Sequence, residues 1–299
     1  MIHNFDELLE SAAHSGSTRA LVVSPTNGET FDAIRNARRR LGLEFLLTGD
    51  LQAIKSALPE LDGIEIVHRP DIAGSLTAAM ELLAQGEAGI LMKGSLDTAT
   101  LLKAALKPES GLRTGRLLSD VFLFEYAPRP ANKLVMITDG GLNIAPDLEA
   151  KTQLIRNAVE VAHALGNATP KVAVLSASEF VQPNMPSSTD AALLAEMNLR
   201  GLITGCVVAG PLALDNALAP RAASEKGIRS DVAGAAEILV CPNIESANIL
   251  AKATTYIGNA RLAHVIIGAR IPILIPSRAD QSDAKLLSLA LGMIMRAPH

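Results

Sequence analysis

The sequence predicts an α/β protein, because short apolar runs alternate with segments of helical periodicity along most of the chain. Its composition agrees with this fold class. Of the 299 residues, 48% are hydrophobic and only 3% are aromatic, with no tryptophan. The cores must therefore be built from Ala, Leu, Ile and Val, which suit the packing of helices on sheets. The length is enough for two ordinary domains.

The N-terminal part predicts strands that are each followed by a helix. Asp97 is placed to cap the last of these helices. Repeated strand–helix pairs indicate parallel βαβ units. The expected strands are Ala20–Ser24, Phe45–Thr48, Ile64–Val67 and Ala88–Met92, and the expected helices are Gly28–Leu41, Leu51–Leu58, Ile72–Ala84 and Thr98–Leu106.

Two consecutive strands, Leu117–Tyr126 and Lys133–Thr138, then interrupt the alternation. A proline-containing connector joins them in the manner of a hairpin, and we place a domain transition near residue 130. The alternation resumes afterwards. The later helices are expected at Leu148–Leu165, Thr189–Arg200, Leu218–Lys226, Ser246–Ile257 and Asp283–Arg296, and the strands at Val172–Leu175, Cys206–Ala209, Glu237–Cys241, Ala263–Ile267 and Ile271–Ile275.

Charge and composition argue against several classes of partner. The net charge of −4 and the scarcity of aromatic residues disfavour nucleic-acid binding. The most apolar stretch, 263–276, is shorter than the roughly 20 residues of a membrane span and contains His264 and Arg270. Cys206 and Cys241 lack metal-ligand spacing and are expected to be core residues in a reducing cytoplasm. The N-terminus does not resemble a signal peptide. We therefore expect neither a metal site nor a membrane location.

One strand end carries an unusual concentration of polar groups. The apolar run Ile271–Ile275 stops abruptly, and Ser277, Arg278, Asp280 and Asp283 follow before the last helix. A guanidinium beside the first amides of a helix favours a bound anion. The sequence therefore predicts a site for a phosphate-bearing ligand here, while both aspartates could equally be helix caps.

Other strand ends carry polar groups of the same kind. Lys93 and Gly94 lie at the end of one strand. The alternative to a ligand-binding role is that Lys93 is a surface lysine at a turn. Asp139 and Gly140 follow another, where the alternative is a plain turn. Ligands of α/β proteins bind at the carboxyl ends of strands. A further polar group, Asn243, Glu245 and Asn248, follows Cys241. None of these residues by itself indicates a ligand site. Together these groups suggest one anion-binding cleft.

These motifs, in this order, resemble the phosphate acetyltransferase/phosphate butyryltransferase family. The matching segments lie between residues 88 and 295 and include Leu91–Thr98, Gly111–Thr114, Ile137–Glu149, Gly210–Ala217, Ser230–Gly234, Pro242–Glu245 and Pro276–Asp280. The resemblance implies two α/β domains with a cleft between them, of the isocitrate/isopropylmalate dehydrogenase-like type. It places residues 1–130 and 270–299 in the first domain and 131–269 in the second. It also implies a homodimer or higher homo-oligomer formed through the second domain.

The resemblance also implies a reaction: acyl-CoA and inorganic phosphate give acyl phosphate and CoA by direct transfer in a ternary complex. Both reactants are substrates, and no tightly bound cofactor is expected. Arg278 would grip phosphate with its planar fork, and Ser277 would add a hydroxyl contact. Asp283 is the first choice for the base and Asp280 the second. The remaining candidates for phosphate or CoA binding are Lys93, Gly94, Arg113, Asp139, Gly140, Asn243, Glu245 and Asn248.

Some residues differ from the family pattern, and two segments favour one branch of the family. Ala247 stands where glycine is common, and Ala251 and Lys252 stand where a Tyr-Lys pair is common. The sequences of the segments Gly210–Ala217 and Ser277–Asp280 are more similar to the butyryltransferase branch of the family than to the acetyltransferase branch. The sequence leaves two alternative functions. One is an NAD-dependent decarboxylating hydroxyacid dehydrogenase on a similar scaffold, and the other is a non-catalytic CoA-binding module.

Overall fold

The chain folds into two compact units in the computed structural model, which describes residues 1–57, 63–277 and 279–296. The terminal unit contains residues 5–116 and 262–299, and the central unit contains residues 1–4 and 117–261. The sequence analysis expected divisions near residues 130 and 270. The units divide earlier at both points, and the first division leaves the hairpin of β5 (Ser119–Glu125) and β6 (Leu134–Thr138) within one unit.

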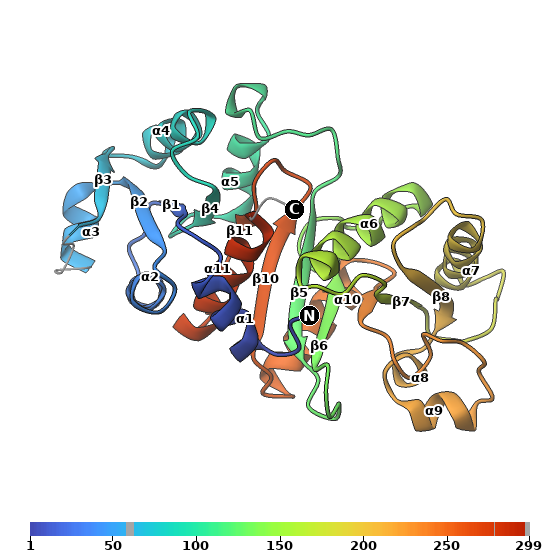
Figure 1. Cartoon of the computed structure of the whole chain (residues 1–299). Helices are drawn as coiled ribbons and strands as arrows, with labels where there is room; N and C mark the ends of the chain where they lie inside the picture. Colours follow the sequence, from blue (N-terminus) through green and yellow to red (C-terminus); the bar gives the residue numbers. More distant parts are fainter. Residues whose placement is uncertain (58–62, 278, 297–299) are drawn as a thin grey trace. The chain divides into compact units, whose positions relative to one another are not determined.

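The sheet of the terminal unit has the strand order β3-β2-β1-β4-β11-β10. All neighbouring pairs are parallel except β10 with β11, which pair through Ile266 and Ile273. The carboxyl ends of β1, β4 and β11 therefore lie at the same edge (Figure 1). The strands are β1 (Arg19–Val23), β2 (Glu44–Gly49), β3 (Glu65–His68), β4 (Ile90–Lys93), β10 (Leu262–Ile267) and β11 (Ile273–Leu274).

Helices of the terminal unit begin where the sequence supplies caps. The side chain of Asp97 accepts the N–H of Thr100 at 2.8 Å, which confirms its predicted role as a cap. No element was expected at Phe5–Ala13, which forms α1 and buries Phe5, Leu8, Leu9 and Ala12. The other helices are α2 (Gly28–Leu41), α3 (Leu51–Ala57), α4 (Ile72–Ala84), α5 (Thr98–Ala105), the 3-10 turn η1 (Pro108–Ser110) and α11 (Ser282–Arg296). Leu58, predicted to end the second helix, lies outside the described residues.

The last helix, α11, is the most deeply buried helix segment of the terminal unit. Every residue from Lys285 to Ile294 is buried. Figure 1 shows α11 beside α1 and α2, and it also contacts β10, β11 and β4. A Cβ at Gly292 would meet the side chains of Ile90 and Leu274 at 3.5 Å, so the helix lies close to β4 and β11 at this point. The end of the chain is thus part of the core that the N-terminal strands build.

The central unit has the strand order β5-β6-β9-β7-β8. The predicted hairpin is confirmed, because β5 and β6 pair antiparallel with Val121 opposite Thr138. The other pairs are parallel. The strands β7 (Lys171–Leu175), β8 (Val207–Leu212) and β9 (Ile238–Val240) contribute to an apolar core with residues such as Leu175, Leu212 and Leu239.

Two predicted helices of the central unit differ from the structure by more than two residues at their start. The helix expected to start at Thr189 is α7 (Pro186–Leu199), because proline is favourable in the first turn. The helix expected at Leu218–Lys226 is two short helices, α8 (Leu214–Leu218) and α9 (Pro220–Glu225). Ala219 between them has extended backbone, as expected for a residue before proline. The remaining helices are α6 (Leu148–Ala164) and α10 (Ile244–Tyr256). Among the described residues, no helix combines the length and apolar character needed to cross a bilayer.

Candidate active site

The predicted site residues fall into two groups, one in each unit. Arg278 lies outside the described residues. The terminal unit carries Lys93, Gly94, Arg113, Ser277, Asp280 and Asp283, and the central unit carries Asp139, Gly140, Asn243, Glu245 and Asn248.

Lys93 ends β4 and is only 5% exposed. Its Nζ donates to the carbonyl oxygen of Leu96 at 3.2 Å, which folds the side chain back over its own turn. The ammonium is therefore held near the edge where β1 and β11 also end. A buried lysine with a fixed position is suited to hold an anion.

Gly94 lets this turn lie against the loop that follows β1. Its N–H donates to the carbonyl oxygen of Val23 at 3.0 Å, and the N–H of Ser95 donates to that of Ser24 at 2.9 Å. A Cβ at Gly94 would lie 2.3 Å from the Val23 oxygen. From the sequence, this glycine was a candidate for contact with phosphate or CoA. The close approach in the structure is by the chain's own backbone.

The segment after β11 is held by polar contacts within the terminal unit. The Asp280 carboxylate accepts the N–H of Ser277 at 2.7 Å, so it fixes the loop and does not cap α11. The first amide of α11 is accepted instead by Glu29 of α2, at 2.6 Å from the Ser282 nitrogen. Asp283 is exposed in the first helical turn. The helix-capping alternative for the two aspartates is therefore wrong for Asp280.

Lys285 is buried directly below this loop. Its Nζ donates to the carbonyl oxygen of Asp280. Burial lowers the pKa of Lys285, and the charges of Asp280 and Glu29 oppose that shift. The loop that carries Ser277 is thus tied to α11 from below.

Arg113 lies in a short segment that runs beside the connection between β10 and β11. Its backbone bridges to Ala269, and the N–H of Arg270 donates to the carbonyl oxygen of Leu112 at 2.9 Å. The residue itself is exposed. The guanidinium therefore extends from a backbone segment that is fixed on the same unit as Ser277.

Asp139 organises the corresponding edge of the central unit. It is 2% exposed, and its carboxylate accepts the N–H of Gly141 at 2.8 Å, the N–H of Leu142 at 3.0 Å and the amide of Asn143 at 2.5 Å. These bonds hold the turn after β6. The sequence predicted that Asp139 contacts phosphate or CoA, but in the structure its carboxylate oxygens accept hydrogen bonds from this turn.

Asp120 is a residue that the sequence analysis missed. It is 1% exposed, and a Cβ at Gly141 would lie 2.4 Å from its Oδ2. Burial, and then the charge of Asp120, raise the pKa of Asp139 to about 6. A carboxylate at the start of an apolar strand was the available signal, but the pairing of β5 with β6 was needed to interpret it.

Gly140 and Asn248 lie together. The Asn248 amide donates to the carbonyl oxygen of Gly140 at 2.8 Å, which ties α10 to the turn after β6. Asn243 caps α10, because its Oδ1 accepts the N–H of Ser246 at 3.0 Å. Glu245 is exposed in the first turn. The structure therefore joins Asp139, Gly140 and Asn248 through one turn and gives Asn243 a helix-capping role.

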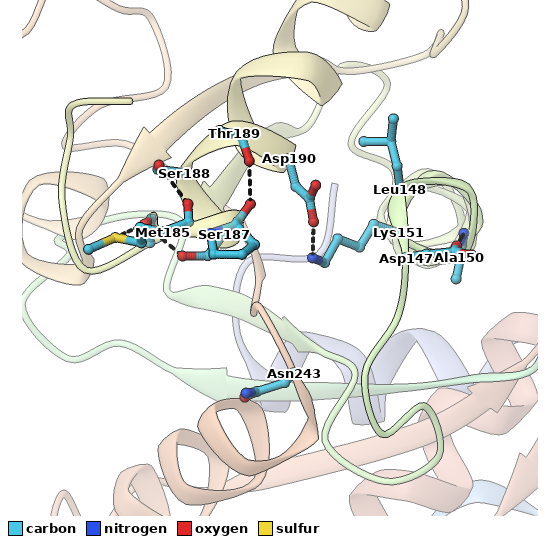
Figure 2. Close-up of polar contacts among 12 residues, drawn as sticks. Asp147, Leu148, Ala150, Lys151, Met185, Ser187, Ser188, Thr189, Asp190 and Asn243 are labelled. Atoms are coloured by element: carbon cyan, nitrogen blue, oxygen red, sulfur yellow. Dashed lines mark hydrogen bonds and ion pairs between the residues drawn. The ribbon is translucent and has the colours of Figure 1, made fainter. Parts of the chain in front are cut away.

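A second buried lysine of the central unit is paired. Lys151 is 4% exposed, and its Nζ lies 2.6 Å from Oδ2 of Asp190. Figure 2 shows this pair between α6 and the first turn of α7, with Asn243 at the start of α10. The carboxylate balances this ammonium, so we do not add Lys151 to the candidate anion ligands. Within the described ranges, no group of three His, Cys, Asp or Glu side chains is placed to hold a metal ion.

We expect Gly94→Ala to destabilise the protein by about 1–3 kcal/mol, because the new methyl group would overlap backbone atoms that cannot move independently. Urea unfolding measures the change. Gly28→Ala is the matched control, since a Cβ there meets nothing within 4 Å. Equal stability of the two variants would contradict the packing described for the turn after β4.

Asp120→Asn should lower the pKa of Asp139, because it removes a buried like charge. The raised pKa means that the folded state favours protonated Asp139. This contribution to stability is present below the unfolded pKa and is lost as pH rises through about 6. The variant should therefore lose less stability across that window.

Carbon-13 NMR titration of the carboxyl groups measures the shift directly. Asp147→Asn is the control, because Asn can still cap α6. An unchanged pKa of Asp139 in Asp120→Asn would exclude the repulsion.

Comparison with known proteins identifies the relatives of this chain. A family model described as phosphate acetyl/butaryl transferase matches residues 63–293. A probable phosphate butyryltransferase of Bacillus subtilis (strain 168) is 42% identical over 290 residues, covering 96% of this chain and 96% of the relative. A phosphate acetyltransferase of Thermotoga maritima is 40% identical over 296 residues, covering 97% and 98%.

A solved structure shares both fold and sequence with the chain. The crystal structure of a branched-chain phosphotransacylase from Enterococcus faecalis V583 superposes with a TM-score of 0.83 at 34% identity. The match covers 93% of this chain and 100% of that one. The resemblance found in the strand-end motifs is thereby confirmed, and the chain belongs to the phosphate acetyltransferase/phosphate butyryltransferase family.

Proposed function

We propose that this protein is an acyltransferase that converts acyl-CoA and inorganic phosphate to acyl phosphate and CoA. The observation that carries the proposal is the buried ammonium of Lys93 at the edge where β4 and β11 both end. Ser277 and Arg278 follow β11 in the sequence. Family membership supplies the reaction class, and the strand-end cation supplies a place for the phosphate.

In the proposed reaction a phosphate oxygen attacks the carbonyl carbon of the thioester. The new carbon–oxygen bond forms as the carbon–sulfur bond breaks, and the thiolate leaves with the electron pair of that bond. The proton of hydrogen phosphate passes to the CoA sulfur. Lys93 and Arg278 hold the phosphate and balance its charge, while Ser277 contributes a hydroxyl hydrogen bond. Holding both substrates together makes the step effectively unimolecular.

A carboxylate would carry the proton between phosphate and sulfur. Asp283 remains the first choice, because it is exposed at the start of α11, whereas one oxygen of Asp280 accepts the N–H of Ser277. We assign Asp280 a positioning role in the loop. Arg113, Gly140, Glu245 and Asn248 stay candidates for CoA contact, and Asp139 and Asn243 are proposed to shape the turns beside them.

We also propose the domain arrangement and assembly that the resemblance implies, namely a cleft between two α/β domains and a homo-oligomer. Exposed apolar side chains at α10 support assembly through the central unit, because Ile249 and Tyr256 of this helix and Ile257 directly after it are 68%, 68% and 86% exposed. Both cysteines are free and buried, which is compatible with the proposed cytoplasmic location.

We propose a butyryl or similarly small branched acyl group as the preferred substrate. Relatives named for butyryl and for acetyl transfer have nearly equal identity, so identity does not decide between them. The sequence of the segment Gly210–Ala217 supports a butyryl substrate, and the similarity to a branched-chain phosphotransacylase supports a small branched one. No observation favours the dehydrogenase or the non-catalytic alternative.

Arg278→Ala should lower kcat/KM by about 10²–10³-fold, because the attacking phosphate loses the bidentate partner that binds and orients it. Release of free thiol from butyryl-CoA in the presence of phosphate measures the rate. Arg221→Ala is the control, since the Arg221 side chain is 90% exposed and pairs with Glu225 of the same helix, α9. Near-normal turnover of Arg278→Ala would refute the assignment.

The two aspartates are separated by their amide variants. Asp283→Asn should lower kcat and remove the acidic limb of the pH–rate profile, while melting at the wild-type temperature. Asp280→Asn should lower the melting temperature, because the loop loses a charged acceptor. If Asp280→Asn abolishes turnover without a change in melting temperature, Asp280 is the base instead.

A further inference from the structure

A groove in the terminal unit lies apart from every residue assigned to acyl transfer. It has a volume of about 450 Å³ and is bordered by α4, α5 and η1. Leu76 and Met80 of α4 form an apolar floor and are nearly buried. The volume is within the range of about 300–1,000 Å³ typical of small-molecule sites.

The wall of the groove at η1 is fixed by hydrogen bonds. Ser110 lines the groove and is 1% exposed. Its Oγ lies 2.6 Å from the carbonyl oxygen of Ala105 and 2.8 Å from that of Lys107, and it accepts the N–H of Leu112 at 3.2 Å. The groove is therefore preformed on this side, which reduces the entropic cost of binding.

The rim of the groove carries opposite charges that do not meet. Glu81 of α4 and Glu109 of η1 contribute carboxylates, and Lys103 of α5 and Lys107 contribute ammonium groups. Across residues 1–57, 63–277 and 279–296, none of these four side chains forms an ion pair or a hydrogen bond. Acid–base neighbours on other exposed helices do pair, as Arg200 does with Glu196 at 2.7 Å.

We propose that this groove binds a free α-amino acid with an aliphatic side chain. The ligand's carboxylate would lie toward Lys103 and Lys107, its ammonium group toward Glu81 and Glu109, and its side chain on Leu76 and Met80. A simple carboxylic acid would leave the glutamates unpaired, and an amine would leave the lysines unpaired. A zwitterion with an apolar group complements the floor and both parts of the rim.

Isothermal titration calorimetry of the full chain with L-leucine tests the proposal. We expect one L-leucine per chain. We also expect binding at least about tenfold weaker for 4-methylpentanoate, which lacks the ammonium group, and for 3-methylbutylamine, which lacks the carboxylate. No binding of L-leucine or L-valine at millimolar concentration would overturn the proposal. Equal affinity for 4-methylpentanoate would do the same.

Substitutions of residues that line the groove test whether L-leucine binds there. Glu81→Gln and Lys103→Gln should each weaken binding about tenfold, and Ala104→Leu should block it by filling the groove. Lys55→Gln is the matched control, because Lys55 is exposed on α3 and outside the groove. If Lys55→Gln weakens binding as much as Lys103→Gln, the site lies elsewhere. Calorimetry needs no turnover, so failure of the proposed transferase activity would not affect this result.

Discussion

The parallel pairing of β11 with β4 is the constraint on which the candidate active site depends. It places Ile273 opposite Leu91, so two strands far apart in the sequence end at one edge of the terminal sheet. Lys93 and the Ser277 loop are brought to that edge by this register alone. The burial of α11 against the same sheet secures the arrangement, because moving the strand would expose a helix that is apolar on nearly every side.

Buried lysines recur in the protein, and their partners distinguish their roles. Lys151 is balanced by the carboxylate of Asp190, so it joins two helices. Lys285 donates to a backbone carbonyl below the Ser277 loop and supports that loop. Lys93 donates to the carbonyl oxygen of Leu96 and ends β4, at the edge where β11 also ends. Its position at that edge makes Lys93 the cation best placed for phosphate among these three.

The sequence predicted most elements because local signals agree with the fold. Short apolar runs indicated the strands, and Asp97 marked a helix start whose cap the structure confirms. The strand-end motifs were sufficient to find the family. Interactions between distant residues could not be predicted. Nothing in the sequence links Glu29 to the amide of Ser282, and Asp120 acquires its influence on Asp139 only when β5 pairs with β6. Gly94 has a steric role that depends on the backbone after β1.

We propose that the edge shared by β4 and β11 binds the phosphate substrate. Steady-state kinetics of Lys93→Met, with phosphate and acyl-CoA varied separately, test this binding, because methionine keeps most of the length of the side chain and removes the charge. We expect kcat/KM for phosphate to fall by about tenfold or more, while the KM for acyl-CoA changes little. An unchanged kcat/KM for phosphate in a correctly folded variant would contradict it.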